Sequence, residues 1–123
     1  MRVLIADKDE AWLEIAQCYL EHYGHEVKTA RNGLEAVAGL RRSPPNVVVL
    51  ERELLWGGSD GVRALMRKVP RWSEIPVILT SSDAIPDHCA FVAGPPVVAR
   101  IQKPFHLQDL LMHFHACSSL VGN

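Results

Sequence analysis

Five side chains able to bind a cation or to neutralise negative charge lie at or just beyond the ends of short apolar runs. They are Asp7, Lys8, Glu51, Thr80 and Lys103. Carboxylate and hydroxyl oxygens are ligands for hard cations, and fixed ammonium groups stabilise negative charge that develops during a reaction. These positions are far apart in the chain, so they form one site only if the fold gathers the ends of the apolar runs.

The apolar runs are typical of strands in a parallel sheet. The clearest is Val47 to Leu50, which ends at the carboxylate Glu51 and precedes a glycine-rich loop. A short continuous apolar run favours a strand buried on both faces, as in a sheet with helices on either side. In such sheets, ligands bind beyond the carboxyl ends of the strands, near the point where the strand order reverses. The predicted strands cover residues 3–6, 25–30, 47–51, 75–80 and 97–101.

Helical patterns alternate with these strands. Apolar residues recur at helical spacing from Trp12 to Tyr23, and Gly24 follows as a residue that can end the helix. Asn32 can cap the next helix, with Glu35 three residues later as in a capping box. Further helices are predicted around 62–69, 86–92 and 107–117, of which the 86–92 segment is polar and interrupted. Five strands alternating with five helices predict an α/β fold: a single-domain, doubly wound, five-stranded parallel sheet over residues 1–123.

Composition and charge exclude several classes of protein. The chain has 123 residues, of which 48% are hydrophobic and 22% charged, as is usual for a soluble globular domain. Its net charge of −1 argues against a nucleic-acid-binding domain. Cys18, Cys89 and Cys117 are widely spaced and odd in number, as expected for reduced thiols in a cytosolic protein. The apolar start is too short for a signal peptide or a membrane span, so we expect a cytoplasmic protein without membrane contact.

Short motifs, in order and at matching spacing, carry a resemblance to a known family. They are Val-Leu-Ile-Ala-Asp at 3–7, Asn-Gly-Leu-Glu-Ala at 32–36, Ser-Asp-Gly at 59–61, Ile-Pro-Val-Ile-Leu-Thr-Ser at 75–81 and Lys-Pro-Phe at 103–105. Over essentially the whole chain this pattern resembles the response-regulator receiver domain of two-component signalling and phosphorelays. The resemblance implies a flavodoxin-like sheet with strand order 2-1-3-4-5 and a cis bond between Lys103 and Pro104.

The resemblance also implies roles for the five side chains. In that family, acidic residues after the first strand hold Mg²⁺, and an aspartate ending the third strand accepts a phosphoryl group. A Thr or Ser ending the fourth strand and the Lys before Pro contact the phosphoryl oxygens. Asp7, Thr80 and Lys103 match this pattern. Lys8 stands where the second acidic residue is expected, and Glu51 stands where the phosphoacceptor aspartate is expected.

Both departures weaken the family's chemistry. The longer side chain of Glu51 displaces its carboxylate by about one carbon–carbon bond, which spoils an in-line geometry that tolerates about 1 Å. Lys8 removes an oxygen ligand and adds a cation, so Asp7 and Glu51 remain as poor candidates for holding Mg²⁺. We expect a pseudo-receiver that is no enzyme and uses no cofactor. In it Lys8 replaces the charge of the metal, and an ionised Glu51 reaches towards Lys103 and Thr80.

The residues leave other interpretations open. The Lys8–Glu51 pair can be an ordinary ion pair in a relaxed pocket without a selected role. A functional phosphoreceiver could instead use Mg²⁺ and a displaced acceptor, either Asp7 or Asp60. A small anion or nucleotide could bind the Gly57–Gly61 loop, although that loop lacks the Gly-Lys-Ser/Thr ending of a nucleotide-binding loop.

Three further positions bear on switching and partners. Trp56 in the glycine-rich loop is either a contact anchor or a packing residue. Arg100 occupies the position where receivers often carry an aromatic switch residue, which together with Thr80 predicts altered switching. The resemblance implies protein partners, such as a histidine kinase, another signalling protein or a second copy, on the face of the fourth helix, fifth strand and fifth helix. Here that face includes Arg100, His106 and His113. No effector domain is predicted, so we expect the output to lie in another chain or segment.

Overall fold

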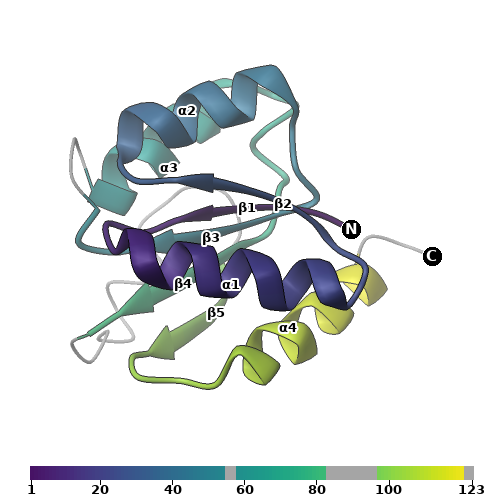
Figure 1. Ribbon diagram of the computed structural model, residues 1–123. Helices are drawn as coiled ribbons and strands as arrows, with labels where there is room; N and C mark the ends of the chain where they lie inside the picture. The colour runs from purple at the N-terminus through teal and green to yellow at the C-terminus, as the bar shows by residue number, and fades with distance from the viewer. Residues whose placement is uncertain (55–57, 83–96, 121–123) are drawn as a thin grey trace.

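The computed structural model describes residues 1–54, 58–82 and 97–120. In these residues, strands and helices follow one another along the chain (Figure 1). The strands are β1 (Arg2–Ala6), β2 (Glu26–Ala30), β3 (Val47–Glu51), β4 (Val77–Ser81) and β5 (Val97–Gln102). The helices are α1 (Glu10–His22), α2 (Gly33–Arg42), α3 (Gly58–Lys68) and α4 (Leu107–Leu120).

All five strands are parallel and lie in the order β2-β1-β3-β4-β5. This order confirms the predicted doubly wound sheet. Its topological switch point, where the strand order reverses, lies between β1 and β3. Ala6 pairs with Leu50, and Glu51 pairs with Thr80. The carboxyl ends of β1, β3 and β4 therefore meet at one edge of the sheet.

Helices cover both faces of the sheet, with α1 and α4 on one face and α2 and α3 on the other (Figure 1). Side chains alternate along each strand, so neighbouring residues enter different cores. Ile5 and Val49 pack with Leu20 of α1 and Phe114 of α4. On the other face, residues such as Leu4 and Leu50 pack with Leu40 of α2 and Met66 of α3. Every residue of β3 and β4 is buried, as their continuous apolar runs predict.

Local sequence signals set the ends of the first two helices. The Asp9 side chain caps α1 by accepting a hydrogen bond from the Trp12 N–H at 3.1 Å. Gly24, with φ of +90°, follows the end of α1 in a conformation that favours glycine. Asn32 caps α2 as predicted, with Oδ1 accepting from the Glu35 N–H at 2.9 Å. The expected capping box is shifted by one residue, because the Glu35 carboxylate accepts from the N–H of Arg31 and not of Asn32.

Several boundaries differ from the predictions. Gly58 to Gly61 form the first turn of α3, so the loop predicted to extend to Gly61 is wrong over these residues. β4 begins at Val77 and not at residue 75, because Pro76 has no N–H and joins β3 only through its carbonyl, which accepts from Val48. α4 extends beyond the predicted end near residue 117. The predicted helix at 86–92 lies outside the described residues, which contain four helices. None of these four is long and apolar enough to cross a membrane.

Candidate functional site

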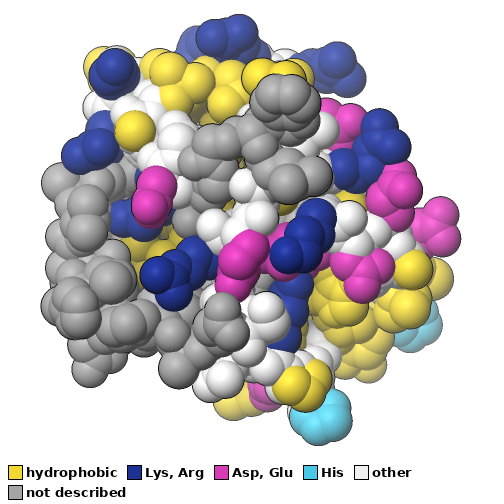
Figure 2. Space-filling model, turned by 90° about the vertical axis from the view of Figure 1, so that its left-hand side faces the viewer, with side chains coloured by type: hydrophobic (Ala, Val, Ile, Leu, Met, Phe, Trp, Pro, Cys, Tyr) yellow, Lys and Arg dark blue, Asp and Glu magenta, His cyan; other side chains and the backbone are white. Residues whose placement is uncertain are grey.

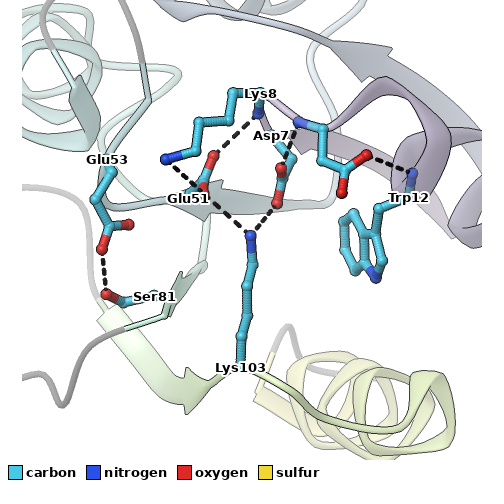
Figure 3. Close-up of polar contacts among 8 residues, drawn as sticks. Asp7, Lys8, Trp12, Glu51, Glu53, Ser81 and Lys103 are labelled. Carbon is cyan, nitrogen blue, oxygen red and sulfur yellow. Dashed lines mark hydrogen bonds and ion pairs between the residues drawn. The ribbon is translucent and has the colours of Figure 1, made fainter.

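The edge where the strands end brings together four of the predicted side chains, which we call the strand-end cluster: Asp7, Lys8, Glu51 and Lys103 (Figure 3). Asp7 and Lys8 follow β1, Glu51 ends β3, and Lys103 follows β5. The carboxylate-bearing side chains are buried, at 1% exposure for Asp7 and 2% for Glu51. Figure 2 views this edge directly and shows acidic and basic side chains next to one another near its centre. Two buried carboxylates thus face two ammonium groups.

Lys103 lies between both carboxylates. Its Nζ is 2.6 Å from Asp7 Oδ2 and 3.1 Å from Glu51 Oε1. Its backbone N–H donates to the Ser81 carbonyl at 2.7 Å, and the peptide bond to Pro104 is cis, as the resemblance implies. The side chain thus extends from the end of β5 to the ends of β1 and β3. It joins the carboxyl ends of three strands.

Glu51 is contacted twice by Lys8. The backbone N–H of Lys8 donates to Glu51 Oε2 at 3.0 Å, and Lys8 Nζ lies 3.7 Å from Oε1. The Lys8 side chain is 50% exposed, whereas the Glu51 side chain that it contacts is 2% exposed. Both oxygens of Glu51 therefore already have partners within the chain.

The charges in the strand-end cluster shift one another's pKa values. Burial raises the pKa of Asp7, and the nearby Glu51 charge adds to this against the opposing effect of Lys103. Burial also opposes ionisation of Glu51, but hydrogen bonds from the Lys8 N–H and Lys103 outweigh it and hold the pKa of Glu51 below its ordinary value. The pKa of Lys103 is raised, because its two carboxylate partners outweigh the effect of burial. Glu51 and Lys103 consequently stay charged near neutral pH.

Thr80 is buried beside Glu51 in the strand register. Within the described residues, no hydrogen bond joins Thr80 to Glu51, which contacts Lys103 instead. The next residue, Ser81, donates through Oγ to Glu53 Oε1 at 2.6 Å. Sequence reasoning missed this pair, although Ser81 ends one of the motifs and Glu53 follows Glu51 by two positions.

Trp12 is a further residue at the site that helical spacing did not reveal. Lys103 Nζ lies 5.7 Å from the centroid of the Trp12 ring, and Phe105 meets the same ring edge-on at 5.9 Å. The helical pattern predicted only that Trp12 belongs to the apolar stripe of α1. A possible signal was its place in the first turn after Asp7, directly beside the expected site.

Comparison with known proteins decides the family. The response regulator receiver domain model matches residues 3–115. The chain belongs to the response regulator receiver domain family. It is 32% identical over 123 residues to the probable transcriptional regulatory protein TcrX of Mycobacterium tuberculosis, covering 98% of this chain and 50% of that protein. It is 29% identical over 119 residues to the response regulator MprA of Mycobacterium leprae, covering 94% of this chain and 50% of MprA.

The chain spans about half the length of these curated relatives. Among solved structures, the chemotaxis protein CheY4 of Vibrio cholerae superposes with a TM-score of 0.84 at 19% identity, covering 94% of this chain and 97% of CheY4. The receiver domain of the Francisella response regulator 1452 gives the same TM-score and identity, with 98% of each chain covered. At this identity the likeness shows the flavodoxin-like receiver fold alone.

Two further predicted positions of this receiver domain, Asp60 and Arg100, lie in α3 and β5. The Asp60 side chain is 89% exposed on α3, with Oδ1 at 3.4 Å from Arg63 Nη1. Arg100 is exposed on β5, where it lines a hollow of about 420 Å³ together with Asp109, Met112 and His113. Trp56 and Gly57 lie outside the described residues. A larger hollow, of about 700 Å³, lies over the edge strand β2 and not at the cluster.

Proposed function

We propose that this receiver domain is a pseudo-receiver, which takes part in two-component signalling through protein contacts and without phosphorylation or Mg²⁺. The observation that carries the proposal is the double engagement of Glu51, by Lys8 on one side and Lys103 on the other. These contacts occupy the carboxylate that stands in the acceptor position. The domain then holds one conformation, and its partners recognise that conformation.

A phosphoryl acceptor needs a carboxylate oxygen free to attack in line. Glu51 Oε2 accepts the Lys8 N–H, and Oε1 lies near two ammonium groups, with the side chain only 2% exposed. Attack would require these contacts to break in a buried setting, where lost partners are costly. The extra methylene of Glu51 also displaces the oxygens from the position that an aspartate would give them.

The residues present do not fit Mg²⁺. This ion requires near-octahedral oxygen coordination at about 2.0–2.1 Å and keeps several water ligands. Lys103 Nζ is hydrogen bonded to Asp7 and Glu51, and Lys8 places a second ammonium group where an acidic ligand is expected. In the part of the chain that the structure describes, no group of three His, Cys, Asp or Glu side chains is arranged to hold a metal. Ammonium groups take the place of the cation.

The two alternative phosphoryl acceptors, Asp7 and Asp60, also lie in surroundings that do not suit phosphoryl transfer. Asp7 is 1% exposed and hydrogen bonded through both oxygens, to Lys103 and to the Asp9 N–H. Asp60 lies on the surface of α3, where its described ionic partner is Arg63. Phosphoryl transfer requires a cation and fixed donors around the acceptor. Among the described residues, no lysine ammonium group contacts Asp60, whereas Lys103 contacts Asp7.

The proposed partners are a histidine kinase, another signalling protein or a second copy of the chain, met in the cytoplasm. The proposed contact face comprises the predicted fourth helix, which lies outside the described residues, together with β5 and the last helix, α4. There the exposed Arg100 and His106 accompany His113, and Met112 of the same helix is 64% exposed. A mixture of one exposed apolar side chain with charged and polar neighbours suits a non-obligate protein interface.

A cation titration tests the proposal. Amide ¹H–¹⁵N spectra of the wild type and of a Glu51→Asp/Lys8→Asp variant are recorded with increasing Mg²⁺. We expect shifts of the amides of residues 7–9 and 51–53 in the variant, at concentrations that leave the wild-type spectrum unchanged. Ca²⁺-free buffer and a matched NaCl titration control for ionic strength. Saturable Mg²⁺ shifts at these amides in the wild type would overturn the proposal.

A further inference from the structure

A closed circuit of contacts links the strand-end cluster to the start of α1. Asp7 binds Lys103 through Oδ2, and its Oδ1 accepts the Asp9 N–H at 2.8 Å. Asp9 in turn accepts the Trp12 N–H through Oδ1 at 3.1 Å, which is the cap of α1. The ring of Trp12 then lies against the Lys103 ammonium, with 5.7 Å between Nζ and the ring centroid. Because Lys103 also binds Asp7, the contacts form a closed circuit.

The Trp12 ring is itself held in place. Phe105, two residues after Lys103, meets it at an interplanar angle of 75° with 5.9 Å between centroids, an edge-to-face arrangement that aromatic pairs favour. Both rings are partly buried and pack against the core between the sheet and the α1–α4 layer. Figure 3 shows the Trp12 ring on the side of Lys103 opposite to Glu53 and Ser81. The Lys103 ammonium group therefore contacts the Asp7 and Glu51 carboxylates and also lies beside the Trp12 ring.

A lysine side chain gains rotational freedom when it leaves such a position, so its placement depends on contacts that restrain it. A cation within about 6 Å of an indole centroid is attracted by the ring, and more strongly when it is partly removed from water. Lys103 meets both conditions, with its side chain 23% exposed.

We propose that Trp12 is a positioning residue, which keeps the Lys103 ammonium directed at Asp7 and Glu51 and so ties the first turn of α1 to the segment after β5. The inference rests on the proposed function in one respect: it treats the cluster as a fixed arrangement that partners recognise. In consequence, a partner that contacts the first turn of α1 senses whether Lys103 is in place. This gives the domain a connection between cluster and surface that involves neither Thr80 nor Arg100.

Limited acetylation of the lysines tests the assignment. The chain has four lysines, at 8, 28, 68 and 103, so peptide mass mapping gives a rate for each. In Trp12→Ala we expect acetylation of Lys103 to be roughly two- to tenfold faster than in the wild type. Lys28 and Lys68, both exposed, serve as internal references and keep their rates. Tyr23→Ala, at the far end of α1 and 55% exposed, is the matched aromatic control and leaves Lys103 unchanged.

Two further variants separate the electrostatic effect of the Trp12 ring on Lys103 from steric shielding of Lys103 by an apolar side chain. Trp12→Phe keeps an aromatic face and is expected to restore a rate close to that of the wild type, whereas Trp12→Leu keeps only apolar bulk and remains faster. The midpoint of the pH profile of Lys103 acetylation moves to lower pH in Trp12→Ala and returns in Trp12→Phe.

An unchanged Lys103 rate in Trp12→Ala would overturn the assignment, as would equal acceleration at Lys28 and Lys68. The acetylation experiment uses neither a phosphodonor nor Mg²⁺. Its result therefore stands apart from the test of the proposed function, and either idea can fail alone.

Discussion

Lys103→Met removes an ammonium group that contacts both buried carboxylates of the strand-end cluster, while it keeps a long unbranched side chain. Asp7 Oδ2 loses a partner at 2.6 Å and Glu51 Oε1 loses one at 3.1 Å. Removing one member of a buried ion pair typically costs about 3–5 kcal/mol, because a buried charge is left uncompensated. Lys8 still contacts Glu51, so we expect the lower end, about 3 kcal/mol at neutral pH.

The pH dependence of this loss follows from Asp7. Burial already raises the pKa of Asp7 in the folded chain, and Lys103→Met removes a group that lowers it. A carboxyl group whose pKa is higher in the folded than in the unfolded chain destabilises the fold when ionised, and this penalty disappears as the pH falls through the folded pKa. The free-energy difference between variant and wild type should therefore shrink as the pH falls through the pKa of Asp7 in the folded variant, which lies above that in the wild type.

Urea unfolding followed by far-ultraviolet circular dichroism measures this difference. With an m-value of about 1–3 kcal/mol per molar urea, the midpoint of Lys103→Met should fall by roughly 1–3 M at neutral pH. Lys28→Met is the matched control, because Lys28 is exposed on the edge strand β2, and a change of about 0.5 kcal/mol or less is expected. A loss below about 1 kcal/mol for Lys103→Met, or one that does not diminish at lower pH, would refute the reasoning.

Two other predictions concern Glu51 and the core. Because the pKa of Glu51 is lower in the folded chain, its charge stabilises the fold above the unfolded pKa, and this contribution is lost as the pH falls through the folded value. Glu51→Gln should thus lower the urea midpoint at neutral pH by an amount that shrinks in acid; a constant gap would contradict the ionised state of Glu51. Phe114→Ala, at a side chain 1% exposed in α4, should cost about 3–5 kcal/mol in the same assay. Met112→Ala, 64% exposed on the same helix, should cost about 0.5 kcal/mol or less, and similar losses for the two would contradict the assigned core.

Much of the fold follows from signals that act locally. The run from Val47 to Leu50 has no polar side chain that could face water, so it predicts the buried central strand β3. Asn32 marks the start of α2 because its side-chain oxygen accepts a hydrogen bond from a backbone N–H of the first turn. Gly24 marks the end of α1 because glycine readily adopts the positive φ found there. The contact between Glu51 and Lys103 could be expected because parallel strands bring their carboxyl ends to one edge.

Other features depend on tertiary packing that spacing does not encode. Helical periodicity identifies Trp12 as apolar but not the direction of its ring, which Phe105 and Lys103 determine from the other end of the chain. Propensity favours a loop at Gly58 and Gly61, yet both lie in the first turn of α3, a helix that packs into the core through Val62 and Met66. The backbone N–H of Lys8 donating to Glu51 was also unforeseen, because only the Lys8 side chain entered the charge argument.

Lys8 and Glu51 have complementary effects on the site. A shorter acceptor would leave the Lys8 N–H without the 3.0 Å contact that Glu51 Oε2 provides, and an acid at position 8 would place a third carboxylate beside Asp7 and Glu51. Like charges in a buried setting repel unless a cation joins them. In the proposed pseudo-receiver, the two departures from the family pattern therefore compensate for each other.

The most direct measurement is the intact mass of the chain after incubation with acetyl phosphate and Mg²⁺, with Glu51→Asp/Lys8→Asp treated in parallel. The account predicts no added phosphoryl group on the wild type and one on the double variant, whose fold and remaining donors Thr80 and Lys103 are unchanged. A phosphoryl group on the wild type would contradict the central claim, and peptide mapping would then identify the acceptor. A double variant that takes up none would contradict the claim that positions 8 and 51 alone disable the site.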